Sequence, residues 1–255
     1  MEMIHVNGVG LEVRRIGTPA VGPALVFLHE GLGSVAMWRD WPAELCRMAG
    51  LSGVVYSRRG YGASDAIADV RGSGRLAPDY MHREALEVLP ALVEALGIER
   101  PILLGHSDGG TIALLHASRF PLRGCVVMAP HVIVEDVSVR SIEQARDAYE
   151  NGDLRQRLAR YHADVDSAFW QWNDIWLAPE FRSFDIRAEC RRITCPVLAI
   201  QGESDPYGTL RQVEEIAPTR GLLRTAVIPQ CGHSPHRDQP QRTNAAVLEF
   251  LKLLG

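Results

Sequence analysis

Short apolar runs alternate along the chain with longer segments in which apolar residues recur every three or four positions. The short runs, rich in Val, Ile and Leu, predict strands at 3–6, 11–16, 24–29, 53–57, 101–106, 124–129, 196–202 and 223–229. The longer segments predict helices at 38–48, 80–96, 109–119, 209–217 and 240–254. Central strands that are almost wholly apolar are typical of a parallel sheet with helices on both faces. The expected fold is α/β, with a mostly parallel, doubly wound, eight-stranded sheet whose first two strands form a hairpin.

One segment interrupts this alternation. Residues 131–192 contain polar helical stretches but no strand-like run, and they carry an aromatic cluster of Phe169, Trp170, Trp172 and Trp176. We expect residues 1–130 and 193–255 to form an α/β core, and residues 131–192 to form a helical lid inserted into this single domain. Parallel sheets bind ligands beyond the carboxyl ends of their strands, so a lid at that edge would cover a binding site.

The composition and charge of the chain argue against several functional classes. The 255 residues carry a net charge of -4 without a basic stripe, which argues against a nucleic-acid partner. The N-terminus does not resemble a secretory signal and no apolar run is long enough for a bilayer, so we expect a soluble cytoplasmic protein without a membrane partner. We interpret the five cysteines as buried hydrophobic residues. Cys190 and Cys195 could form a metal pair, but no histidine lies near them in the sequence to complete the site. The oligomeric state, monomer or homodimer, stays open.

The stretch "LLGHSDGG" at 103–110 carries the strongest chemical signal. Gly105, Ser107 and Gly109 follow a predicted strand and precede a predicted helix, which is the context of a nucleophile elbow. In such a turn the serine has strained backbone and projects above the sheet, and the glycines let strand and helix approach closely. The alternative is an ordinary strand-to-helix turn with glycine caps.

A serine hydroxyl needs a base to take its proton and an acid to orient that base. Asp205 follows the strand-like run at 196–202, and His233 follows the run at 223–229. The order Ser, Asp, His, with each residue beyond the end of a strand, is the order expected of an α/β-hydrolase.

These residues carry a family resemblance over essentially the full chain. Besides the elbow, the matching stretches are "FLHEGLGSVAMW", "SRRGYGASD", "GESDPYG" and "CGHSPH". The chain is similar to members of the α/β-hydrolase fold superfamily, in the branch of small esterases, lactonases and carbon–carbon bond hydrolases. The first stretch resembles the loop that supplies part of the family's oxyanion hole, but has Glu30 where glycine is common. The resemblance therefore leaves either Gly31 or Leu32 as one backbone donor, beside the N–H of Asp108. The second stretch has Ser57 where the family usually has aspartate, and we interpret it as structural.

Other polar residues near these loops have alternative interpretations. Glu203 could replace Asp205 as the orienting acid, and Glu135 or Asp136 lie where some relatives place it, although we interpret the latter two as surface residues at the lid hinge. We interpret His236 and Asp238 as polar groups at the start of a helix. His106 is interpreted as a packing residue of the elbow, and His29 as a residue that holds the geometry of its loop.

The predicted activity is hydrolysis of a small carboxylic ester, thioester or lactone through an acyl-enzyme. Ser107 is the predicted nucleophile, His233 the general base and acid, and Asp205 the residue that fixes the imidazole, with no metal or organic cofactor implied. A carbon–carbon bond hydrolase or enol-lactonase could use the same residues, and a ligand sensor on the same fold is a further alternative.

The substrate is expected to be a small molecule that contacts the lid. Trp170, Trp172 and Trp176 either line the pocket or form the core of the lid. The carboxylate of Asp108, next to the nucleophile, suggests a cationic or hydrogen-bond-donating substrate if it faces the pocket. It would otherwise be a group that interacts favourably with the dipole of its helix.

Overall fold

The computed structural model describes residues 1–17 and 24–255, and these residues contain an eight-stranded sheet of order β1-β2-β4-β3-β5-β6-β7-β8. The strands are β1 (Glu2–Val6), β2 (Val9–Ile16), β3 (Ala24–Leu28), β4 (Ser52–Tyr56), β5 (Ile102–His106), β6 (Gly124–Met128), β7 (Val197–Gly202) and β8 (Leu223–Ile228). β2 pairs antiparallel with β1 and β4, and the remaining neighbours are parallel. The expected mostly parallel α/β sheet is confirmed, including the hairpin, whose turn residues Asn7 and Gly8 both have positive φ.

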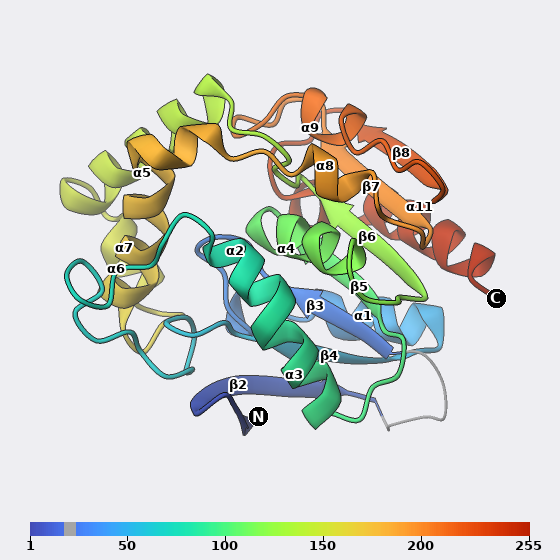
Figure 1. The fold of residues 1–255 in the computed structure, drawn as a ribbon, viewed down its shortest axis with the longest axis horizontal. Helices are drawn as coiled ribbons and strands as arrows, with labels where there is room; N and C mark the ends of the chain where they lie inside the picture. The colour runs from blue at the N-terminus through green and yellow to red at the C-terminus, as the bar shows by residue number, and fades with distance from the viewer. Residues whose placement is uncertain (18–23) are drawn as a thin grey trace.

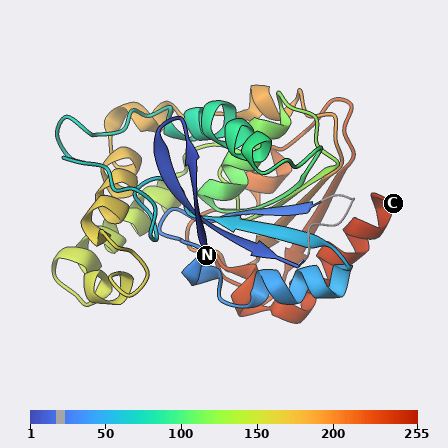
Figure 2. The ribbon, with the colours of Figure 1, turned by 90° about the horizontal axis from the view of Figure 1, so that it is seen from below.

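Helices cover both faces of the sheet. They are η1 (Ala36–Trp38), α1 (Trp41–Ala49), α2 (Tyr80–Arg83), η2 (Glu84–Val88), α3 (Leu89–Ala95), α4 (Asp108–Ala117), α5 (Asp136–Glu150), α6 (Leu154–Leu158), α7 (Val165–Trp176), η3 (Pro179–Ser183), α8 (Arg187–Cys190), α9 (Arg211–Glu214), α10 (Pro235–Asp238) and α11 (Pro240–Leu253). Figure 2 shows α1 and α11 on one face of the sheet, and α2, α3 and α4 on the other. Among the described residues, every helix is too short or too polar to span a bilayer.

The apolar strands are buried because helices cover both of their faces. β3, β5, β6 and β7 are buried at every position. Successive side chains point to opposite faces, so Val26 and Leu28 join one hydrophobic core while Leu25 and Phe27 join the other. Two cores that sandwich a nearly wholly apolar sheet give the loops at its edge a rigid base.

A helical segment joins β6 to β7 and contains α5, α6, α7, η3 and α8. Its helices α5, α6 and α7 gather at one end of the sheet in Figure 1. Ile142 and Trp176 of this segment belong to the same buried cluster as Val26 of β3. Polar contacts add to the attachment: the Ile67 N–H donates to the Ser167 hydroxyl at 3.0 Å, and Arg71 pairs with Asp174 at 2.8 Å.

Three of the five predicted helices differ from the observed ones by more than two residues at an end, or are interrupted. The helix expected at 38–48 begins at Trp41, and the helix expected at 209–217 shortens to Arg211–Glu214. The helix expected at 80–96 is divided by a π-helical stretch, Glu84–Val88, that ends just before Pro90. Proline has no N–H to donate to the preceding turn, and a widened turn is one way in which a helix accommodates that loss.

Two glycines allow the nucleophile turn to pack. A Cβ on Gly105 would overlap the backbone of Gly109, and a Cβ on Gly109 would overlap the carbonyl of Leu28 in β3. Backbone atoms cannot rotate away as side chains do, so α4 approaches β3 and β5 this closely only with glycine at both positions.

Gly109→Ala is therefore expected to destabilise the fold by about 1–3 kcal/mol or more, as over-packing of a rigid core does. Gly110→Ala is the matched control, because its Cβ would lie 3.2 Å from the Pro130 Cβ and 3.3 Å from the Gly105 carbonyl oxygen, whereas a Cβ on Gly109 would overlap the Leu28 carbonyl oxygen. Denaturant unfolding of the two variants measures the difference. Equal stabilities would contradict the close approach of α4 to β3.

Candidate active site

Ser107 lies between β5 and α4 in a strained turn. Its φ of 53° and ψ of -119° are unusual for a residue with a side chain. The Ser107 N–H donates to the Met128 carbonyl of β6 at 2.9 Å, so the neighbouring strand fixes the turn. The conformation is that of the predicted elbow.

The structure brings the three predicted catalytic residues into one series of hydrogen bonds. His233 Nε2 lies 2.9 Å from the Ser107 hydroxyl oxygen, and His233 Nδ1 lies 2.9 Å from each carboxylate oxygen of Asp205. A carboxylate accepts, so Nδ1 carries the proton of a neutral imidazole and Nε2 is free to accept from the hydroxyl. The three groups come from loops that follow β5, β7 and β8.

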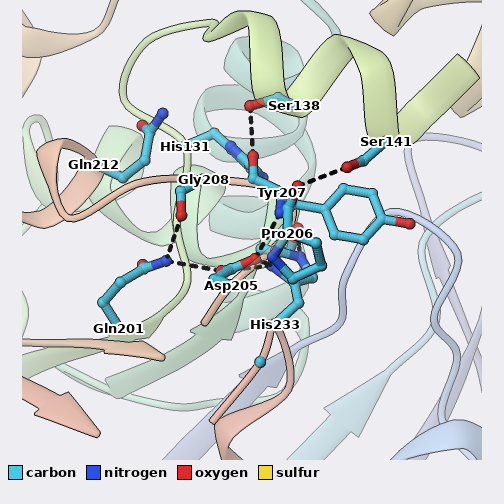
Figure 3. Close-up of polar contacts among 12 residues, drawn as sticks. His131, Ser138, Ser141, Gln201, Asp205, Pro206, Tyr207, Gly208, Gln212 and His233 are labelled. Atoms are coloured by element: carbon cyan, nitrogen blue, oxygen red, sulfur yellow. Dashed lines mark hydrogen bonds and ion pairs between the residues drawn. The ribbon is translucent and has the colours of Figure 1, made fainter. Parts of the chain in front are cut away.

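Asp205 is held by groups other than the histidine. Its carboxylate accepts from the Tyr207 N–H at 2.8 Å and from Nε2 of Gln201 at 2.7 Å, as Figure 3 shows. Burial alone would raise the pKa of Asp205, but the hydrogen bond and charge of His233, with the N–H of Tyr207, lower it below its ordinary value. The carboxylate is therefore ionised at neutral pH.

The loop that carries Asp205 is bonded to helix α5. The hydroxyls of Ser138 and Ser141 donate to the carbonyls of Tyr207 and Pro206 at 2.5 and 2.6 Å (Figure 3). The helical segment between β6 and β7 is thus attached to this loop, which we call the acid loop, as well as to the sheet.

The loop after β3 is fixed by His29 and Arg58. The Arg58 guanidinium donates to the His29 carbonyl at 2.6 Å and the Glu30 carbonyl at 3.1 Å. The Arg58 N–H donates to His29 Nε2 at 3.0 Å, while Nδ1 contacts the Glu30 carbonyl at 2.7 Å. These bonds require a neutral imidazole, and burial, with the Arg58 charge, lowers the pKa of His29. His29 holds the loop, as its position suggested.

The Asp108 carboxylate is fully buried and has partners of its own. It accepts from the Tyr80 hydroxyl at 2.5 Å and from Nε1 of Trp176 at 3.3 Å, and it lies 3.9 Å from Arg58. Burial raises the pKa of Asp108, against the opposing effects of Arg58 and the two donors. The polar atoms of Asp108 and Trp176 therefore point toward each other, and contact of either with substrate stays a prediction.

The other two tryptophans lie in different places. The Trp172 indole lies against Gly31, where a Cβ would overlap its ring, and so contacts the predicted oxyanion loop directly. Trp170 lies under the guanidinium of Arg71, 3.8 Å from its ring centroid, and beside Phe169. Trp170 is thus placed in the aromatic packing of the helical segment, and its predicted contact with substrate has no support from these neighbours.

The alternative residues for the acid and the base have other contacts. Glu203 is exposed, Glu135 accepts from Thr209, and Asp136 pairs with Arg182. His236 packs beside Trp38 and Trp41, and Asp238 accepts from the Gly232 N–H. Among the described residues no cluster of His, Cys, Asp and Glu could hold a metal ion, and all five cysteines are free and buried.

Several important neighbours were not predicted. Glu12 of β2 accepts from the Ser57 hydroxyl at 2.7 Å and the Ala63 N–H at 3.0 Å, and so places a buried carboxylate beside the position where relatives usually have aspartate. His131, after β6, lies with its ring centroid 5.8 Å from that of His233, and burial lowers its pKa to about 3. Pairing of sheet strands brings Glu12 close to Ser57, across 45 residues of chain.

This fold is that of the α/β-hydrolases. The model of the alpha/beta hydrolase family matches residues 25–246. The chain belongs to this family of enzymes.

Relatives are recognisable over nearly the whole chain. Serine hydrolase BPHL of Mus musculus is 26% identical over 98% of this chain and 85% of its own. A 2-hydroxy-6-oxo-6-phenylhexa-2,4-dienoate hydrolase of Comamonas testosteroni is 23% identical over 98% of this chain and 91% of its own. The crystal structure of the enol-lactonase from Burkholderia xenovorans superposes with a TM-score of 0.74 at 19% identity, covering 98% of this chain and 100% of that one. The last likeness concerns the fold alone.

His162 gives the helical segment a contact that depends on pH. Its Nδ1 accepts from the Gly62 N–H and its Nε2 donates to the Leu32 carbonyl, both at 3.0 Å, so the bonds need a neutral ring. Burial lowers the pKa of His162 below the usual 6.5 in the folded protein. The unfolded chain then binds a proton that the folded chain does not, so the free energy of unfolding falls as the pH drops below that usual value.

Replacing His162 with Asn should therefore flatten the pH dependence of stability just below pH 6.5, by up to about 1.4 kcal/mol per pH unit. Thermal unfolding at several pH values measures the slope, with His5→Asn as control because His5 is exposed on β1. An unchanged slope would show that His162 is not the neutral ring that these bonds require.

Proposed function

We propose that this chain is a serine hydrolase that cleaves a small carboxylic ester, thioester or lactone through an acyl-enzyme. The observation that carries the proposal is the series of hydrogen bonds from Asp205 through His233 to Ser107, each about 2.9 Å long at the histidine. Ser107 Oγ attacks the acyl carbonyl carbon and its proton passes to His233 Nε2. The bond to the leaving group breaks as His233 returns that proton. Water, deprotonated by His233, then cleaves the acyl-enzyme.

Two backbone groups are proposed to bind the oxyanion of the tetrahedral intermediate. Among the described residues, none accepts a hydrogen bond from the N–H of Gly31 or from that of Asp108 at the start of α4. The N–H of Leu32 is the alternative to that of Gly31. Loss of one such donor typically costs about 3 kcal/mol of transition-state stabilisation.

The helical segment 131–192 is proposed to act as a lid that shapes the acyl or alcohol site. Two observations support this role: Trp172 lies against the oxyanion loop, and the Trp176 ring lies 4.8 Å from that of His131. A small, partly apolar substrate suits such aromatic neighbours. An ammonium group on the substrate would have to share the Asp108 carboxylate with Tyr80, Trp176 and Arg58.

Carbon–carbon bond hydrolysis is a second candidate, because one of the relatives is named for a dienoate hydrolase activity. A panel of short esters, thioesters, lactones and vinylogous diketones separates the two. Stoichiometric rather than repeated release from an activated ester would instead favour a ligand sensor.

Ser107→Ala should lower ester hydrolysis by about 10⁴-fold or more while the fold is kept, because serine, histidine and aspartate act as a unit. Steady-state rates with short activated esters, and labelling by a fluorophosphonate probe, measure the effect. Ser234→Ala is the control, since the Ser234 side chain makes no capping bond at α10. Near-normal turnover by Ser107→Ala, or probe labelling at another residue, would overturn the proposal.

Asp108→Asn should keep hydrolysis of neutral esters within about tenfold, because the backbone N–H is the same in both residues. If the carboxylate also attracts substrate, wild type should prefer an ester with an α-ammonium group over its uncharged analogue, and the variant should not. The measurement is kcat/KM for such a matched pair. A preference that survives the substitution undiminished would exclude Asp108 as its source.

A further inference from the structure

Three loops of the candidate active site meet at the side chain of His106. This residue immediately precedes Ser107, and it is 1% exposed. Its Nε2 lies 2.6 Å from the backbone carbonyl oxygen of His233, and its Nδ1 lies 3.4 Å from a carboxylate oxygen of Glu30. Glu30 adjoins Gly31, the proposed oxyanion donor. The imidazole, carried by the turn of Ser107, thus contacts the loop of His233 (the histidine loop) and the loop of Glu30 and Gly31 (the oxyanion loop).

The two contacts together determine how many protons the ring carries. A carbonyl oxygen can only accept a hydrogen bond, so Nε2 must carry a proton for the short contact to His233. An ionised carboxylate also only accepts, so Nδ1 must carry a proton for the contact to Glu30. A neutral imidazole has one N–H and satisfies only one of the two acceptors.

The missing proton could in principle belong to Glu30 instead. Burial by itself would raise the pKa of this carboxyl group. The Glu30 side chain is nevertheless 19% exposed, so water can solvate its carboxylate, and the hydrogen bond from His106 favours the ionised form. The carboxylate form of Glu30, facing an imidazolium, is the arrangement that satisfies both contacts.

We infer that His106 is a positioning residue, which works as an imidazolium paired with Glu30 and ties the His233 backbone to the oxyanion loop. The inference rests on the proposed hydrolase function, because positioning matters only if His233 and Gly31 act on substrate. It also assigns a role to Glu30, the residue that departs from the glycine usual in this family. Neither side chain touches the reacting atoms.

The other groups around His106 do not replace Glu30. His236 of α10 lies 5.0 Å from His106 between ring centroids, and burial keeps its pKa well below the usual range, so it is neutral. His131 is neutral for the same reason. Trp38 of η1 is uncharged, and the His233 ring, 5.2 Å away, offers no negative charge in either protonation state. Among the described residues, Glu30 is the carboxylate in contact with the His106 ring.

The pair has a consequence for catalysis that a packing role would not have. With the Glu30 carboxylate removed, the Nδ1 side of His106 would lose its charged acceptor, and the ring would no longer tie the His233 backbone to the oxyanion loop. The histidine loop and the oxyanion loop would move relative to each other. Displacements of about 1 Å at reacting groups can cost about a hundredfold in rate.

Ring-nitrogen NMR of the full chain tests the protonation directly, by two-bond correlation of histidine ¹⁵N and carbon-bound protons. In wild type at pH 7, both nitrogens of His106 should carry protons. In Glu30→Gln at the same pH, His106 should give the signals of a neutral ring. A neutral His106 in wild type would overturn the inference, whatever the activities are.

Kinetics of Glu30→Gln, His106→Gln and the double variant test the positioning role. Each single substitution should lower kcat for a neutral ester by about tenfold to a hundredfold with little change in KM, and the double variant should be no worse than the poorer single one. Additive losses in the double variant would contradict the pair.

A control accounts for the loss of a buried histidine as such. His116→Gln removes a buried ring of α4 that bonds the Ala85 carbonyl away from the site, and it should leave kcat unchanged. The Ser107→Ala result distinguishes the two proposals. If that variant were active while His106 proved to be an imidazolium, the hydrolase mechanism would fail and the ion pair would stand.

Discussion

The backbone conformation at Ser107 is the constraint on which the rest of the site depends. A positive φ at a residue with a side chain is unfavourable, and it persists because α4 is packed against β3 and β5 through Gly105 and Gly109. The same turn sends three successive side chains in different directions. His106 reaches Glu30 and the histidine loop, Ser107 reaches His233, and Asp108 enters the cluster of Tyr80, Trp176 and Arg58. One strained residue thus orders three sets of contacts.

Charged pairs occur on both sides of the proposed oxyanion loop. Arg58 bonds the carbonyls of this loop and faces Asp108, while Glu30 of the same loop faces His106. Such pairs are weak evidence for stability, because desolvation offsets the attraction between the charges, although removal of one partner is costly. Their value here is geometric. They hold a loop without regular secondary structure at a fixed place beside Ser107, the proposed nucleophile, where small displacements would have large kinetic effects.

The sequence was sufficient to predict what depends on local pattern. Apolar runs located all eight strands, and the order of Ser107, Asp205 and His233 at strand ends predicted their convergence, because parallel strands end at one edge of the sheet. Contacts that depend on pairing between distant segments could not be predicted in this way. Gln201 points toward Asp205 only because of its place at the end of β7, and Glu12 meets Ser57 through the pairing of β2 with β4. The mutual bond of Asp108 and Trp176 likewise joins residues 68 positions apart.

The bonds from α5 to the acid loop affect how this enzyme could be recombined with its relatives. Ser138 and Ser141 hold the carbonyls of Tyr207 and Pro206, directly beside Asp205. A chimera that exchanged only the helices between β6 and β7 would give the loop of Asp205, the proposed orienting acid, a foreign partner. The natural unit of exchange therefore extends past β7 to include this loop, so that the helices and the placement of Asp205 are inherited together.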